Sequence, residues 1–150
     1  AEKYLWTPLG AEGEATWLLD SQGVEFNCIG LGARLRDWAK LGQLVAQQGR
    51  WNAQQIISRD WMEGYSKWTQ ADAQVRPGML KGKGANQGYK FFIWHDRSDG
   101  SRPSFSGAYG QHVFVDLPTQ TVLVQTCVTD ESSEQKRELG SLFQAAVEAS

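Results

Sequence analysis

The chain has 150 residues, the size of one domain, with 15 basic and 17 acidic side chains and a net charge of −2. This near balance gives no electrostatic reason to expect nucleic acid or an anionic membrane surface as a partner. No stretch approaches the roughly 18 uninterrupted apolar residues of a transmembrane helix, and no signal peptide is visible, so we expect a small molecule or a protein as the partner.

Tryptophan and cysteine are the informative residue types. Seven tryptophans exceed what packing requires in a chain of this size. Because tryptophan is frequent in pockets and interfaces, we expect some of them to line a cleft or a contact surface and most to lie in the core. Cys28 and Cys127 are far apart and have no metal-ligand spacing around them, which favours two unpaired thiols over a disulfide. No metal and no other cofactor is expected.

The first third of the chain predicts two segments of different kinds. Residues 1–6 are typical of the last turn of a helix, which Pro8 and Gly10 end. Residues 11–29 lack periodicity and predict a loop with a short extended piece near residues 25–28.

Two helices are predicted next. Apolar residues recur every three to four positions in 33–48, and Gly49 stands where a C-terminal cap is expected. A shorter helix is predicted from Ser58, as N-cap, to about Lys67. Its expected buried residues are Trp61, Met62 and Tyr65.

Residues 70–87 contain several glycines with lysines between them. Gly82-Lys83-Gly84-Ala85 resembles a phosphate-binding loop only superficially, because a true one ends in Gly-Lys-Ser/Thr and begins a helix. The segment is therefore expected to be a mobile surface loop.

Three antiparallel strands are predicted in the second half of the chain. Aromatic residues in 88–95 predict the first strand, which the turn residues of 96–102 end. The stretch 104–116 predicts the second, and the valine-rich stretch 121–128 suits a central strand.

Ser132 and Gln135, at capping-box spacing, predict the start of a final helix. We expect its apolar stripe to pack on the sheet; the stripe consists of Leu139, Leu142, Phe143, Ala146 and Val147. Helices grouped before and after antiparallel strands describe an α+β fold. It would be a single partial domain, with a helical and loop segment over 1–87 and the sheet and last helix over 88–150.

The stretch 104–116 pairs glycines with strand residues more densely than any other part of the chain. From Tyr109 to Asp116 the residues alternate between two faces, which is the period of a strand, while Gly107 and Gly110 interrupt the pattern. Two glycines there indicate a bulge, or a place where a ligand approaches the backbone closely. A bent strand in an ordinary hairpin would give the same pattern.

Four short motifs occur in an order and spacing that span nearly the whole chain. They are Leu5-Trp6-Thr7-Pro8-Leu9-Gly10, Gly32 with Arg36-Asp37-Trp38-Ala39-Lys40-Leu41-Gly42, Gly88-Tyr89, and Gly107-Ala108-Tyr109-Gly110-Gln111 continuing to Asp116. Together they resemble the serine hydrolases of the superfamily of class C beta-lactamases, penicillin-binding proteins and carboxylesterases, nearest the esterase-like and aminohexanoate-oligomer hydrolase members. The resemblance implies a beta-lactamase-like fold with the active site between the sheet and a helical region.

The resemblance also implies which residues form the site. Phe105-Ser106-Gly107 looks like the Lys-Thr-Gly-like triplet that lines the site in this superfamily. The backbone N–H of Ala108 would then belong to the oxyanion hole, and a fixed donor of this kind contributes roughly 3 to 4 kcal/mol. Phe105, Ser106 and Gly107 would contact the substrate. Tyr109 and Gln111 would follow at the cleft edge or pack behind it.

Phe105 stands where the lactamases commonly have Lys or His. The cation that would pair with a carboxylate-bearing beta-lactam is therefore missing, which disfavours such substrates. An apolar or aromatic residue at this position is similar to the esterase-like members.

The other two catalytic motifs of the superfamily are a Ser-x-x-Lys, which supplies the nucleophile and its base, and a Tyr-x-Asn or Ser-x-Asn, which supplies a second proton-transfer group. Neither occurs here at its expected place. No Tyr-x-Asn or Ser-x-Asn occurs, and the single Ser-x-x-Lys, Ser133 to Lys136, follows the glycine strand instead of preceding it. We interpret it as the start of the last helix, where Lys136 stays solvated and protonated and so is a poor base. His95 and His112 have no nearby Ser and acid in the sequence, and both are expected to be structural.

The resulting hypothesis is a C-terminal portion of a serine acyl hydrolase that contributes the oxyanion strand and part of the substrate pocket. Its partners would be a small acyl substrate and the N-terminal segment that bears the nucleophile, from the same protein or from a second copy of the chain. The alternative is a noncatalytic module of the same fold that binds a ligand or peptide. The superfamily is often periplasmic or secreted, but the sequence does not assign a compartment.

Overall fold

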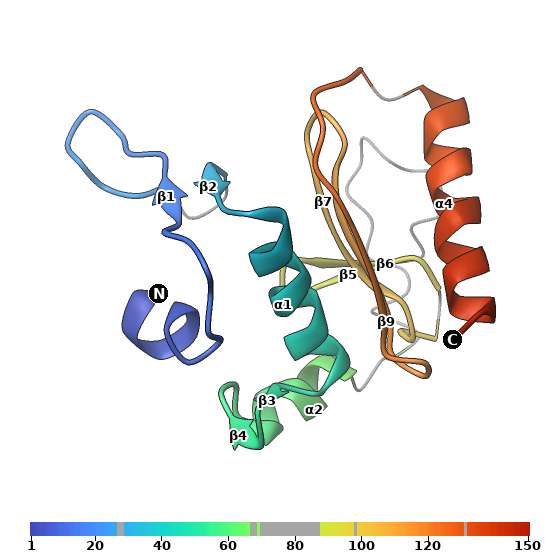
Figure 1. Cartoon of the computed structure of the whole chain (residues 1–150), viewed down its shortest axis with the longest axis horizontal. Helices are drawn as coiled ribbons and strands as arrows, with labels where there is room; N and C mark the ends of the chain where they lie inside the picture. Colours follow the sequence, from blue (N-terminus) through green and yellow to red (C-terminus); the bar gives the residue numbers. More distant parts are fainter. Residues whose placement is uncertain (27–28, 67–68, 70–87, 98, 131) are drawn as a thin grey trace.

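A five-stranded antiparallel sheet separates two long helices, α1 (Leu35–Ala46) and α4 (Ser133–Glu148), in this computed structural model (Figure 1). The structure describes residues 1–26, 29–66, 69, 88–97, 99–130 and 132–150. In spatial order the strands are β5 (Gly88–Lys90), β6 (Ile93–His95), β7 (Pro103–Gly107), β8 (Gln111–Asp116) and β9 (Thr121–Gln125). The arrangement confirms the α+β class. In the described ranges no helix is long and apolar enough to cross a membrane.

Two of the predicted strands are hairpins. The prediction of one strand over residues 88–95 is wrong, because Phe91 and Phe92 have φ of 50° and 65° and turn β5 back into β6. Non-glycine residues seldom adopt this conformation, so two phenylalanines gave no turn signal. The stretch 104–116 is also two strands, β7 and β8, joined at residues 108–110. The prediction of a single strand over residues 104–116 is therefore wrong, because Tyr109 and Gly110 form a turn inside the stretch.

The N-terminal part forms short elements that sequence periodicity could not show. It begins with a π-helix, η1 (Glu2–Trp6), and continues to β1 (Thr16–Trp17), which pairs with β2 (Leu31–Gly32). The prediction of a loop over residues 11–29 with a short extended piece near residues 25–28 missed this ladder, because two-residue strands leave no pattern. Residues 27–28 of the predicted extended piece lie outside the described residues.

A buried carboxylate attaches this N-terminal part to α1. Asp37 is fully buried and accepts the backbone N–H of Glu12 at 2.8 Å and of Gly13 at 3.2 Å. Lys40 lies 3.1 Å from the Glu12 carboxylate and donates to the carbonyl of Gly10 at 2.6 Å. Part of the Arg36-to-Gly42 motif thus has a structural explanation, since Asp37 and Lys40 hold the incoming chain on the helix.

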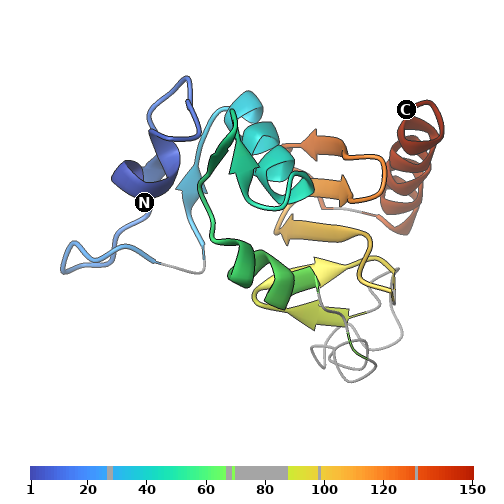
Figure 2. The same cartoon turned by 90° about the horizontal axis from the view of Figure 1, so that it is seen from below.

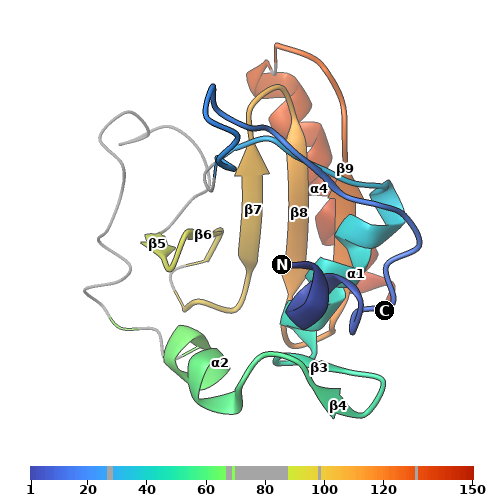
Figure 3. The same cartoon turned by 90° about the vertical axis from the view of Figure 1, so that its left-hand side faces the viewer.

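Helix α1 lies across β8 and β9 (Figure 3). Its bounds fall inside the predicted range, and the expected cap is present: the Gly49 N–H donates to the carbonyl of Leu44 at 2.8 Å with φ of 79° at Gly49. Gly42 faces the sheet so closely that a Cβ there would lie 2.6 Å from Val122 Cγ1 and 2.9 Å from Val113 Cγ1. The buried core of this face consists of Val45, Ala46, Met62, Val113 and Val115.

After α1, β3 (Arg50–Trp51) and β4 (Gln54–Gln55) form a small hairpin that leads to α2 (Arg59–Ser66). Ser58 caps α2 as expected, its Oγ accepting the Trp61 N–H at 3.3 Å. Met62 is buried, but the prediction that Trp61 is buried is wrong: 55% of it is exposed, and its ring stacks on Phe91 at 5.1 Å. Figure 2 shows α2 beside the β5–β6 hairpin that supplies this contact. The side chain of Tyr65, Lys67 and the predicted loop 70–87 lie outside the described residues.

Helix α4 begins at the predicted capping box, in which the Gln135 N–H donates to Ser132 Oγ at 3.2 Å. Leu139 and Phe143 are buried against the sheet, and the Phe143 ring stacks on Phe114 at 5.4 Å. The prediction for Leu142 is wrong, because 57% of it is exposed. It lies one residue, about 100°, round the helix from Phe143 and so leaves the stripe that faces the sheet. Ala146 and Val147 are half-buried.

A largely buried ion pair connects the start of β7, the end of β8 and α4. Arg102 Nε donates to Asp116 Oδ1 at 2.6 Å, and Thr119 donates to Asp116 Oδ2 from its N–H and its hydroxyl. Burial alone would raise the pKa of Asp116, but the hydrogen bonds from Arg102 and Thr119 outweigh it and hold that pKa below its usual range. Arg102 also donates to Gln144 Oε1 at 2.7 Å and lies over the Phe143 ring. The register of the β7–β8 hairpin is thereby fixed at its base.

Polar side chains are buried where β6 leads into β7. Ser104 is fully buried, and its hydroxyl donates to Asp96 Oδ1 at 3.3 Å. Burial raises the pKa of Asp96 to about 6. The hydrogen bond from Ser104 and the charges of His112 and Arg102 lower this pKa, but they offset only part of the rise. His95, at the end of β6, is fully buried, a position that suits a structural histidine.

We expect Gly42→Ala to lower the free energy of unfolding by about 1 to 3 kcal/mol, because the methyl group would overlap two valines of the sheet. The gain in helix propensity, about 1 kcal/mol, acts in the opposite direction. Gly140→Ala in α4 is the matched control, since a Cβ there meets nothing within 4 Å, and it should stabilise by up to about 1 kcal/mol. Urea unfolding measures both; a stabilised Gly42→Ala would contradict the close packing of α1.

The raised pKa of Asp96 predicts a pH-dependent stability. A carboxyl group whose pKa rises from 3.8 to about 6 on folding takes up a proton, so its contribution to stability falls as the pH rises through that interval. We expect Asp96→Asn to be more stable than the parent by about 1 to 3 kcal/mol near pH 8, and the two to converge near pH 4. Urea unfolding at both pH values tests this, and a parent that is the more stable near pH 8 would show that Asp96 is not desolvated.

Candidate active site

The second half of β7 has an unpaired edge. Strand β6 pairs with β7 only at Pro103 and Ser104, whereas β8 pairs with β7 from Ser104 to Gly107. Among the described residues, Phe105–Gly107 therefore has a neighbouring strand on one side only, and Ser106 and Gly107 are exposed. An open strand edge can offer backbone hydrogen bonds to an extended ligand.

The turn that follows β7 exposes a backbone donor. Ala108 is exposed, and within the described part of the chain its N–H donates no hydrogen bond. Tyr109 and Gly110 have φ of 62° and 85°, so the turn is left-handed directly after Ala108. The Tyr109 side chain is 63% exposed. The sequence assigned substrate contact to Phe105, Ser106, Gly107 and Tyr109. These residues thus lie next to one another on the open edge of β7 and on the turn that follows it.

The two faces of β7 differ in character. Phe105 packs against the core on the α1 side. Ser106 points the other way, and its Oγ lies 3.2 Å from His112 Nδ1, with donor and acceptor set by the tautomer of the ring. The prediction that His112 has no serine near it is wrong. Ser106 and His112 are cross-strand partners in the β7–β8 ladder, and spacing along the sequence alone did not show this pairing.

Gln111 packs behind the turn. Its side-chain amide donates to the carbonyl of Cys127, which lies just beyond β9, and to the carbonyl of Tyr109 at 3.4 Å. Of the two sequence-based alternatives for Gln111, these bonds favour packing behind the site over a place at the cleft edge.

An apolar cavity of about 210 Å³ lies between the sheet and the helices, beside Phe105. Two of the tryptophans line it, as the composition predicted for some of them. The lining residues are Leu5, Trp38, Leu41, Leu44, Val45, Ile57, Trp61, Met62, Ile93 and Phe105. Its described lining residues include no charged side chain, so a ligand held there would be recognised through its apolar part.

The Ser-x-x-Lys sequence lies at the first turn of α4, the helix on the other side of the sheet from α1 (Figure 1). Lys136 is exposed. This placement agrees with the interpretation of that sequence as the start of a helix. In the described ranges, no three His, Cys, Asp or Glu side chains gather in an arrangement that could hold a metal ion.

Comparison with known proteins gives one similar sequence and two similar folds. No protein-family model matches the chain. The chain is 26% identical over 126 residues to the 6-aminohexanoate-dimer hydrolase of Paenarthrobacter ureafaciens, a match that covers 81% of this chain and 31% of that enzyme.

Two solved structures share the fold. One, from Bacillus anthracis and named as a 6-aminohexanoate-dimer hydrolase, aligns over 95% of this chain and 35% of its own, with a TM-score of 0.77 and 23% identity. The other, from Bacteroides dorei DSM 17855 and named as a beta-lactamase, aligns over 98% of this chain and 50% of its own, with a TM-score of 0.69 and 15% identity. The chain thus spans about a third to a half of the length of these relatives. The chain therefore has a beta-lactamase-like fold, and its sequence is similar to that of a 6-aminohexanoate-dimer hydrolase.

Proposed function

We propose that the chain supplies the oxyanion strand and part of the substrate pocket of a serine-dependent acyl hydrolase that cleaves an ester, amide or beta-lactam bond. The observation that carries the proposal is the exposed N–H of Ala108, in a left-handed turn at the end of the open edge of β7. The similarity to a curated hydrolase over most of the chain supports the same class of reaction.

In the proposed reaction the carbonyl oxygen of the substrate accepts a hydrogen bond from Ala108 N–H. As a serine attacks the carbonyl carbon, negative charge develops on that oxygen, and a donor already fixed on the backbone stabilises it without reorganisation. Phe105, Ser106 and Gly107 then run beside the acyl group, and Tyr109 covers the turn at the rim. The unpaired edge of β7 supports this path, because it leaves room for a substrate beside the strand.

The acyl part of the substrate is proposed to be uncharged and apolar near Phe105. The triplet contains no cation to pair with a carboxylate, and the adjoining cavity is lined by apolar side chains. The curated relative is named for the dimer of 6-aminohexanoate, which supports an amide with straight apolar chains as the substrate class.

The nucleophile and its base are proposed to come from a segment outside residues 1–150, the N-terminal segment of the same protein, carried on the same polypeptide or on a second one. Residues 1–150 would then form a single partial domain. In the described part of the sheet β9 has a partner on one side only, and its residues are half-buried. Natural proteins usually cover such an edge, so further strands of the proposed segment would pair there.

Removing the Ala108 N–H tests the oxyanion assignment. In the enzyme assembled from this chain and the segment with the nucleophile, Ala108→Pro should lower kcat for a chromogenic ester by about 10²- to 10³-fold, because proline has no N–H to donate. Ala108→Gly keeps the donor and is the control, with a kcat expected within a few-fold of the parent. Circular dichroism of both variants verifies folding. A Pro variant that is folded and as active as the Gly variant would overturn the assignment.

Residues 1–150 expressed alone should show no significant turnover of a chromogenic ester or a chromogenic beta-lactam, because an oxyanion donor without a nucleophile gives only small residual rates. Adding the segment with the Ser-x-x-Lys motif in trans should restore activity. Strong turnover by residues 1–150 that Ser133→Ala abolishes would refute the proposal. Binding of the ester without turnover in the assembled protein would indicate the noncatalytic module instead.

A further inference from the structure

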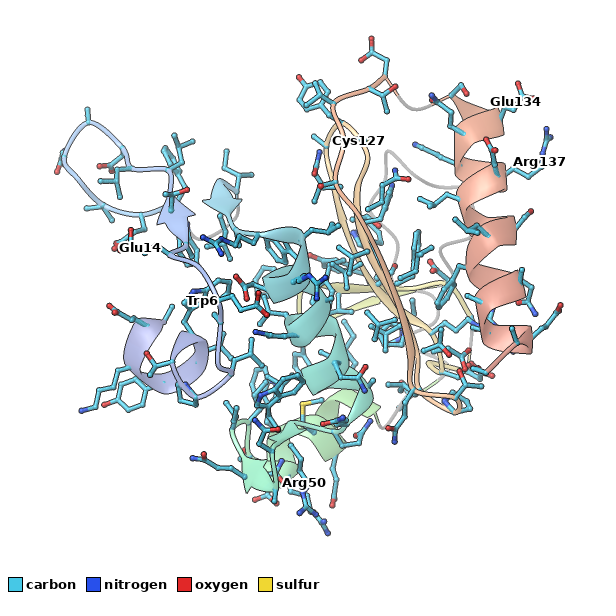
Figure 4. All side chains as sticks on the ribbon, in the orientation of Figure 1. Trp6, Glu14, Arg50, Cys127, Glu134 and Arg137 are labelled. Carbon is cyan, nitrogen blue, oxygen red and sulfur yellow. The ribbon has the colours of Figure 1, made fainter. Side chains whose placement is uncertain are left out.

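Two carbonyls of the turn at residues 108–110 are held by the last residue of β9 and by the chain just beyond it. The carbonyl of Tyr109 accepts the Thr129 N–H at 3.2 Å and lies 3.3 Å from Cys127 Sγ. The carbonyl of Gly110 accepts from Gln125 Nε2 at 3.2 Å and lies 3.2 Å from the same sulfur. The thiol has one proton, so it serves one of the two carbonyls at a time. Figure 4 shows Cys127 at the end of the sheet where the β7–β8 turn lies.

These bonds hold a backbone conformation that is strained on its own. Tyr109 has φ of 62°, a conformation that is unfavourable for a non-glycine residue and persists only where the surroundings fix it. Gln111 adds to the restraint, because its amide joins the Cys127 carbonyl to the same turn. Gly110 is buried, whereas Ala108 and Tyr109 are exposed. The turn is therefore fixed on its carbonyl side and open on its N–H side.

We propose that Gln125 and Cys127, with Gln111, are positioning residues that hold the Tyr109–Gly110 peptide planes and thereby aim the Ala108 N–H at the substrate. The inference rests on the proposed function. The orientation of the Ala108 N–H depends on the dihedral angles of Ala108 and Tyr109, because planar peptide units can turn only about those bonds. The Ala108 N–H lies between these fixed carbonyls and Gly107, which is paired with Gln111 in the β7–β8 ladder, so it loses most of its freedom. A donor fixed before the reaction stabilises the oxyanion better than a mobile one.

Two substitutions remove donors from this arrangement without placing charge in it. Gln125→Leu keeps a similar volume but deletes the amide that bonds Gly110, and Cys127→Ala deletes the thiol. In the assembled enzyme we expect Gln125→Leu to lower kcat for a chromogenic ester by about tenfold or more, with KM within about twofold of the parent. Affinity for a boronic acid that mimics the tetrahedral intermediate should fall by a similar factor, while affinity for the carboxylic acid product should not. Cys127→Ser, which keeps a donor at that place, should be more active than Cys127→Ala.

Gln54→Leu is the matched control, because Gln54 is an exposed glutamine in β4, outside the proposed site. It should leave kcat, KM and boronic acid affinity unchanged. Equal loss of boronic acid and product affinity in Gln125→Leu, together with lower thermal stability, would indicate a merely structural role and overturn the inference. An unchanged kcat would overturn it as well.

Amide hydrogen exchange separates failure of the inference from failure of the proposed function. Peptides that cover residues 107–112 should exchange faster in Gln125→Leu than in Gln54→Leu, whether or not the protein is an enzyme, because the turn loses a restraint. Faster exchange in a protein without hydrolase activity would refute the proposed function and leave the restraint of the turn established. Normal exchange in an active enzyme would refute the inference alone.

Discussion

The contact of α1 with the sheet at Gly42 determines the geometry on that side of the molecule. A helix can approach a sheet this closely only where it lacks a side chain, and the methyl groups of Val113 and Val122 occupy the space that a Cβ would take. The close approach places Leu44 and Val45 in the core and directs the end of the helix into the Gly49 reversal. Helix α2 follows from that reversal, so the cavity beside Phe105 depends on how closely α1 packs on the sheet.

The opposite face of the sheet depends on charge and aromatic contacts instead of close backbone approach. Arg102 bonds Asp116 and Gln144 and lies over Phe143, so a single guanidinium joins the base of the β7–β8 hairpin to α4. Asp116 stays ionised there because the donors around it outweigh the effect of its burial. The hairpin is thereby fixed at the end of the sheet opposite its turn. The turn is placed precisely because the hairpin is restrained both at its base, by Arg102, and at the turn itself.

The candidate site combines an open edge with a restrained turn, and the two properties have different sources. The edge is open because β6 stops pairing at Ser104, which leaves Phe105–Gly107 without a neighbour on that side in the described structure. The turn is restrained because Gln125, at the end of β9, and the chain that follows it place donors beside the carbonyls of Tyr109 and Gly110. A substrate site needs both, since it must admit a ligand and must not move when charge develops.

The sequence by itself determined the features that depend on local chemistry. Helix α1, its cap at Gly49 and the capping box of Ser132 and Gln135 follow from periodicity and from side chains within a few residues, and the order of the motifs indicated the superfamily. Only the tertiary structure decided the rest. Phe91 and Phe92 adopt a turn conformation that is unfavourable for phenylalanine. The pairing of β5 with β6 on either side of them imposes it. His112 meets Ser106, and Gln125 meets Gly110, only after the sheet forms, because a cross-strand contact is set by register and not by distance along the chain.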